Sequence, residues 1–131
     1  MREQPKYWPL IDGGKVSQLY KFGEYRAALL TGMRSLGAVQ YLFVMLVFKA
    51  PTDELCLCIA SEVNDPIDQP PAGSHFLGLF TGDEHRNLGS SNDWADVELF
   101  TARALELSRD HLKVSDEVVE EIPRKPWWRF W

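Results

Sequence analysis

The feature that most constrains the fold is a pair of apolar runs in the first half of the chain. Residues 40–49 are apolar at nearly every position, with many aromatic and β-branched side chains, and a second apolar run covers residues 55–61. The turn-forming segment 50–54 separates them, which predicts two adjacent antiparallel strands. Because both strands are apolar on both faces, we expect them to be central in a sheet covered on both sides.

Further strands are predicted on either side of this hairpin. Residues 75–81 form a third strand, in which Gly78 marks a bulge or the close approach of another backbone. A proline-rich loop, 64–74, precedes it. On the N-terminal side, residues 16–22 are predicted as an edge strand and residues 7–11 as a short strand before the turn at 12–14.

Residues 18–36 allow two interpretations. An apolar stripe from Leu19 to Leu36 can be drawn as a helix, but Gly23 and Gly32 would then lie inside it and cost ~1 kcal/mol each relative to Ala. Residues 24–31 can instead form a strand, followed by a loop at 32–37. We favour the strand.

The clearest helix covers residues 93–112. Val97, Phe100, Ala104 and Leu107 recur at spacings of three and four, which makes one apolar stripe, and Trp94 extends it upstream. Asn92 or Asp93 is predicted to cap its N-terminus. Ser90 and Ser91 are interpreted as capping or loop residues rather than nucleophiles.

These elements predict an α+β fold, an antiparallel four- or five-stranded meander with one long C-terminal helix (93–112) packed on one face. The length of 131 residues fits a single domain, which we assign to residues 1–121. Residues 122–131 are assigned to an aromatic and basic tail. One helix covers one face, so the opposite face needs the aromatic ends of the chain or a second subunit.

The charges are divided unevenly along the chain. Residues 1–49 carry seven Lys/Arg and three Asp/Glu, residues 50–121 carry four and sixteen, and residues 122–131 carry three and none. An acidic middle argues against a nucleic-acid partner, because phosphate binding needs a basic surface. We expect the basic ends to dock on the acidic middle, within one chain or between two.

The cysteines and the hydropathy pattern bear on the cellular compartment. Cys56 and Cys58 lie two apart in an apolar run and are interpreted as reduced core residues. The first ten residues show no apolar signal region, and the longest apolar run, 41–48, is too short for a membrane helix. We therefore expect a cytoplasmic protein.

The most polar segment, residues 82–89, is predicted to be a loop between a strand and the helix. Arg86 can grip a carboxylate or phosphate, and His85 can act as a base near neutral pH. The favoured alternative is an ordinary exposed loop whose acids pair with Arg86. The candidate ligand-binding residues, for a small anion, are Asp83, Glu84, His85, Arg86 and Asn87.

No catalytic or metal-binding motif is evident, so we expect neither a metal nor another cofactor, and we lean against an enzyme. A metal site built from His75, Asp83 and His85 is disfavoured, because a seven-residue strand of ~20 Å separates its ends.

The tail holds the candidate partner-binding residues. Prolines at 123 and 126 favour an extended chain, and three tryptophans fall in the last five residues. The tail is expected to fold back and cap the open face of the sheet, to exchange with a neighbour or bind another protein, or to enter a membrane interface, in decreasing preference. These residues are Trp127, Trp128, Arg129, Phe130 and Trp131.

The leading functional hypothesis is a small non-catalytic binding protein, such as an accessory, inhibitor or immunity-type module, with a protein partner or self-association. The alternatives are a protein or enzyme that binds a small anion through residues 82–89 and an accessory protein that reaches a membrane through its tail.

Overall fold

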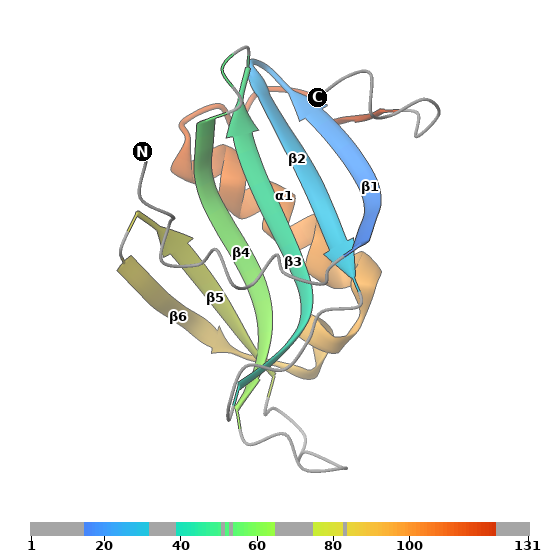
Figure 1. Ribbon diagram of the computed structural model, residues 1–131, viewed down its shortest axis with the longest axis vertical. Coiled ribbons are helices and arrows are strands. Elements are labelled where there is room, and N and C mark those ends of the chain that lie inside the picture. Colours follow the sequence, from blue (N-terminus) through green and yellow to red (C-terminus); the bar gives the residue numbers. More distant parts are fainter. Residues whose placement is uncertain are drawn as a thin grey trace.

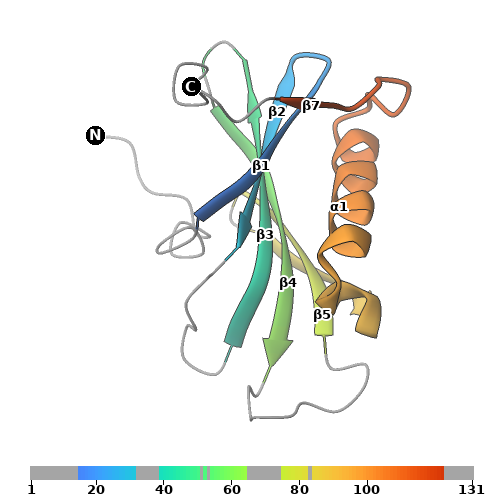
Figure 2. The same ribbon diagram turned by 90° about the vertical axis from the view of Figure 1, so that its right-hand side faces the viewer.

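The computed structural model describes residues 15–31, 39–50, 52, 54–64, 75–82 and 84–122. These residues form one antiparallel sheet of seven strands in the order β6-β5-β4-β3-β2-β1-β7, with a single long helix on one face (Figures 1 and 2). The elements are β1 Lys15–Phe22, β2 Tyr25–Thr31, β3 Val39–Lys49, β4 Glu54–Asn64, β5 His75–Thr81, β6 Glu84–Ser90, a 3-10 helix at Asn92–Ala95, α1 Val97–His111 and β7 Glu120–Ile122.

The predicted hairpin is confirmed as β3 and β4, which pair antiparallel in the middle of the sheet. Alternation along the strands sends side chains to two separate apolar clusters. The cluster beneath the helix includes Met45, Ile59 and Phe100, and the cluster on the opposite face includes Leu46 and Cys58. Both faces of the central strands are therefore buried, as their apolar composition predicts.

The strand interpretation of residues 24–31 is confirmed by β2. Gly23 has a positive φ of 59° in the turn between β1 and β2, a conformation that glycine adopts without the steric cost of a β-carbon. This turn requirement explains why the glycine is there, and it removes the helix interpretation. The expected edge strand at 16–22 is β1, but it is not at the edge, because β7 pairs with its outer side.

Helix α1 runs along one face of the sheet, as Figure 2 shows edge-on. The predicted start at residue 93 is wrong: residues 92–95 form a 3-10 helix, and α1 begins at Val97. Its cap is Asp96, whose Oδ1 accepts hydrogen bonds from the backbone N–H groups of Glu98 and Leu99 at 2.9 and 3.1 Å. Ser91 caps the 3-10 helix, in agreement with its predicted role.

The buried stripe of α1 is rotated from the predicted one. Phe100 and Ala104 are buried as predicted, and the Phe100 ring lies 5.6 Å from that of Phe43. Leu105 and Ser108 are buried as well, whereas Val97 is 38% exposed. The 3-10 helix that precedes α1 is tied to the sheet by the Ser61 hydroxyl, which donates to the carbonyl of Trp94.

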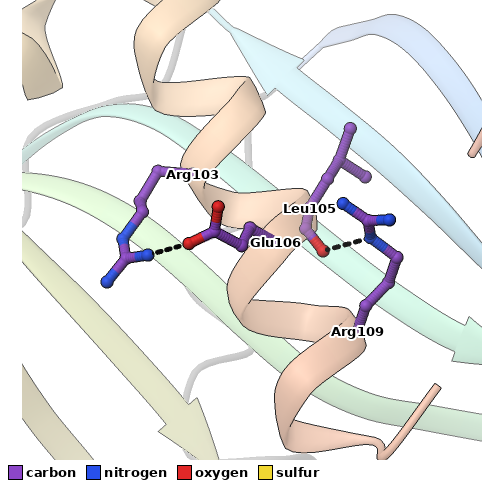
Figure 3. Close-up of polar contacts among 4 residues, drawn as sticks. All are labelled: Arg103, Leu105, Glu106 and Arg109. Carbon is purple, nitrogen blue, oxygen red and sulfur yellow. Dashed lines mark hydrogen bonds and ion pairs between the residues drawn. The ribbon is translucent and has the colours of Figure 1, made fainter. Parts of the chain in front are cut away.

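The C-terminal half of α1 is held by its own basic side chains (Figure 3). Arg103 pairs with Glu106 on the exposed surface, and the Arg109 Nε donates to the carbonyl of Leu105 at 3.4 Å. A second Arg109 nitrogen donates to the carbonyl of Glu117 at 3.1 Å. Arg109 thereby fixes the segment that leads from the helix into β7.

The predicted count of four or five strands is wrong, because the described residues contain seven. Every residue of β6 is exposed and Leu88 is its one large apolar residue, so the strand lacks the apolar alternation by which strands are recognised. β7 has only three residues and forms through its pairing with β1. The short strand expected at 7–11 and the loop expected at 32–37 lie outside the described residues. Of the loop expected at 64–74, Asn64 is the last residue of β4, and the rest lies outside them.

Both cysteines are free, but only Cys58 is a core residue; Cys56 is half-buried beside the register shift between β3 and β4. No helix among the described residues combines the length and apolar character needed to cross a bilayer. The tail from Pro123 to Trp131, predicted to cap the open face or bind a partner, lies outside the described residues, as do the N-terminal aromatic residues.

Candidate functional site

The segment predicted as a polar loop is instead the strand β6, which pairs with β5 at the edge of the sheet. Strand alternation separates the candidate residues: His85 lies opposite Phe80, and Arg86 lies opposite Leu79, which belongs to the cluster on the helix side. His85 and Arg86 are therefore on different faces of the sheet. The structure does not gather Glu84, His85 and Arg86 around one ligand, and Asp83 lies outside the described residues.

The Asn87 side chain is engaged within its own strand. Its Oδ1 accepts a hydrogen bond from the backbone N–H of Gly89 at 2.8 Å, next to a register shift in the β5–β6 pairing. This local contact accounts for the amide at position 87 without a ligand.

His85 instead meets Glu62, a residue of β4 that the sequence did not single out. The Nε2 of His85 lies 2.9 Å from the Oε1 of Glu62, and the two residues belong to strands on either side of β5. They meet over Gly78, because a β-carbon at position 78 would lie 2.7 Å from the Glu62 oxygen and 2.9 Å from the His85 nitrogen. The predicted close approach of another backbone at Gly78 is wrong, because the neighbours are side chains. The alternative prediction, a bulge, agrees with the register shift between Phe76 and Gly78 in the β5–β6 pairing.

The environment of this pair is asymmetric. The Glu62 side chain is 3% exposed and that of His85 is 40% exposed. Burial raises the pKa of the Glu62 carboxyl above its ordinary value of 4.5, and the nearby imidazole offsets part of that rise. Among the described residues the Oε1 accepts no hydrogen bond of good geometry, so the attraction between the two groups is chiefly electrostatic.

Neighbouring side chains complete the site on the face away from the helix. The His85 ring stacks on Phe80, with centroids 4.3 Å apart and planes inclined by 7°. Tyr41 pairs with Glu62 across β3 and β4, and its pKa is raised to about 12, first by burial and then by the Glu62 carboxylate. A buried carboxylate, a stacked imidazole and a phenol are therefore arranged across four adjacent strands.

Chemically, this arrangement holds an imidazole in one orientation and leaves part of it accessible. The ring stacks on Phe80 and its Nε2 contacts the Glu62 carboxylate, so two neighbours set its position. The sequence contains a weak signal for it, since Glu62 is an acid that follows directly on the buried run ending at Ser61. That signal does not identify the partner, which depends on the pairing of three strands.

A second feature is an open groove on the helix side, between α1 and the strands β1, β2 and β7, with a volume of about 600 Å³. We call it the α1 groove. Its apolar lining comes from the sheet and from the first three turns of the helix. These lining residues are Leu29, Val97, Ala102, Leu105 and Val119.

The charged lining of the α1 groove is acidic. Glu98 contributes from the first turn of α1 and Glu121 from β7, and no Lys, Arg or His is found among the described residues that line the groove. A second cavity of about 590 Å³ shares Ser17, Val97 and Glu98 with it and adds Asp96. The arginines of α1 do not offset these acids, because Arg103 and Arg109 are engaged elsewhere.

Within the part of the chain that the structure describes, no group of three His, Cys, Asp or Glu side chains could hold a metal ion. The candidate partner-binding residues of the tail, 127–131, fall outside that part. Comparison with known proteins yields no relative: no family model, no curated protein and no solved structure matches this chain.

Proposed function

We propose that this protein is a non-catalytic binding protein whose α1 groove accepts a segment of a protein partner that is both cationic and apolar. The single observation that carries the proposal is the combination of an apolar floor with acidic walls in an open groove of about 600 Å³. Grooves of this size are typical of ligand sites, and acidic walls favour a positively charged occupant.

The side chains of the groove support recognition rather than chemistry. Its lining includes no Cys or His among the described residues, and the hydroxyl of Thr101 donates to the carbonyl of Val97 at 2.6 Å within the helix. The acid groups differ in origin, since Glu98 belongs to the helix and Glu121 to β7. A bound segment would therefore contact both elements, and its binding would depend on how α1 and β7 are placed relative to one another.

Val97 contributes an apolar side chain to the groove and is 38% exposed. Isolated exposed apolar residues are common on protein surfaces, but this one lies in the lining of an apolar groove. We infer that the aromatic side chains of the partner segment pack against this part of α1.

The test is a titration of a fluorescein-labelled nine-residue peptide of alternating Arg and Trp with the protein, in which binding is measured by fluorescence anisotropy. The double substitution Glu98→Lys and Glu121→Lys, which reverses both charges, should weaken peptide binding by tenfold or more. A peptide with Glu in place of Arg should not bind. Glu84→Lys is the matched control, because Glu84 is an exposed acid in β6 that does not line the groove. An equal loss in the groove variant and the control would refute the proposal.

A second candidate function is favoured by the Glu62–His85 contact of 2.9 Å: binding of a small anion by the His85 side chain. The buried carboxylate positions the ring, and its accessible portion remains open to a ligand. A thermal-shift screen over phosphate and small carboxylates should then show a stabilisation that disappears in His85→Ala. The stabilisation should persist in His111→Ala, at an exposed histidine at the end of α1; a screen with no stabilising anion contradicts this candidate.

A further inference from the structure

Strand β7 runs along β1 toward residues of β1 that line the α1 groove. β7 pairs antiparallel with β1, so that Glu121 lies opposite Tyr20 and Ile122 opposite Leu19. The next positions along β1 are Gln18 and Ser17, and both line the groove. The Gln18 side chain already donates to the carbonyl of Ile122 at 3.1 Å.

The sequence after Ile122 cannot simply lengthen the sheet. Residue 123 is a proline, which has no N–H to donate to β1, and residue 126 is another. A proline at 123 therefore removes the backbone donor that would extend the ladder next to Gln18, a residue of the groove lining. Val119 and Glu121, which immediately precede this point, are themselves part of the groove lining.

The composition of segment 123–131 complements the groove. It carries three basic residues and no acidic one, and its last five residues include four aromatic side chains. The groove presents Glu98 and Glu121 around an apolar floor, and Asp96 adjoins it. Opposite charge and shared apolar character favour contact between the two.

Segment 123–131 is long enough to extend along the α1 groove. Nine residues span at most about 30 Å when extended, whereas the helical stretch from Val97 to Leu105 along the groove is only about 12 Å long. Attachment at the groove edge gives the segment a local concentration on the order of millimolar. Binding within one chain is therefore favoured over exchange between chains at ordinary protein concentrations.

We infer that the α1 groove is occupied by the protein's own C-terminal segment, residues 123–131, bound within the same chain. This inference rests on the proposed function of the groove and specifies its regulation. A partner must displace the segment, so it must present the same chemistry, basic residues interspersed with large aromatic ones, in a form that binds more tightly. The free protein is held in a self-occupied state.

The experiment compares three full-length proteins with the labelled Arg/Trp peptide described above. The tail variant carries Arg124→Glu, Lys125→Glu and Arg129→Glu. The matched control carries Lys21→Glu, Lys49→Glu and Lys113→Glu, which give the same net charge at exposed positions outside the groove lining. The third is the unchanged protein.

If the segment fills the groove, the tail variant should bind the peptide about tenfold more tightly than the control, as for a segment with a Kd near 100 µM at an effective concentration of about 1 mM. Equal affinity of the tail variant and the control overturns the inference but leaves the groove as a binding site. Absence of peptide binding to all three proteins overturns the proposed function as well.

Light scattering distinguishes binding of the segment within its own chain from binding to a second copy of the protein. The unchanged protein and the tail variant should both have the mass of a monomer over a wide range of concentrations. A dimer that dissociates in the tail variant would show that the segment binds a second copy, and it would overturn the inference of binding within one chain.

Discussion

The close contact over Gly78 makes the substitution Gly78→Ala a demanding test of the site. A β-carbon there would lie 2.7 Å from the Glu62 Oε1 and 2.9 Å from the His85 Nε2. Carbon atoms make their best contacts at roughly 3.5–4.0 Å, so both groups would have to retreat. The Glu62 side chain is 3% exposed and has little room to move. We expect a loss of about 1–3 kcal/mol in the free energy of unfolding, as for other overpacked cores.

Urea denaturation followed by circular dichroism measures this loss as a lower midpoint with an unchanged slope. The decisive comparison is Gly78→Ala in a Glu62→Ala background. There the carboxylate is gone, and the half-exposed His85 ring can yield, so the cost of the added methyl group should nearly vanish. The close-approach reasoning would be refuted if Gly78→Ala alone left the free energy of unfolding within about 0.5 kcal/mol of that of the unchanged protein. It would also be refuted if Gly78→Ala lowered that free energy equally with and without Glu62→Ala.

Three further predictions follow from the described contacts. Burial raises the folded-state pKa of Glu62 above the unfolded value of 4.5, so between the unfolded and the folded pKa the native protein binds more protons than the unfolded chain. The free energy of unfolding should therefore fall as pH rises through that window. Urea titrations of Glu62→Gln should lack this fall, and a pH profile identical to that of the unchanged protein would contradict the prediction. Phe100→Ala, at a fully buried position beside Phe43, should cost about 3–5 kcal/mol by the same assay, whereas a loss under 1 kcal/mol would place the ring outside the core. Asp96→Ala removes both capping hydrogen bonds of α1 and should cost about 1 kcal/mol, with Asp93→Ala as a nearly neutral control; equal losses would argue against the cap.

The candidate site shows how far local sequence signals reach. Gly78 was recognisable as the position of a bulge or a close approach, because a glycine inside a strand needs a reason. His85 was recognisable as a candidate, but its expected companions were its sequence neighbours. Arg86 lies on the other face of the sheet, since successive residues of a strand alternate. The actual companion, Glu62, comes from a strand that is not even adjacent to β6.

The strands that the sequence missed share one property. β6 is exposed along its whole length, and β7 has three residues. Neither buries enough apolar surface to leave a periodic pattern, so each is a strand only because its backbone pairs with a neighbour. The same pairing of β7 with β1 sets one wall of the α1 groove.

The sequence by itself determined the central hairpin, the strand at 75–81 and the existence of the long helix. In the strands, burial of both faces produces continuous apolar runs, and in the helix burial of one face produces a spacing of three and four; both patterns can be recognised locally in the sequence. Tertiary structure decided the strand count, the Glu62–His85 contact and the α1 groove, because these depend on which distant backbones pair and in what register. If the pairing of β6 with β5 were shifted by one residue, His85 would turn to the helix side of the sheet, away from Glu62.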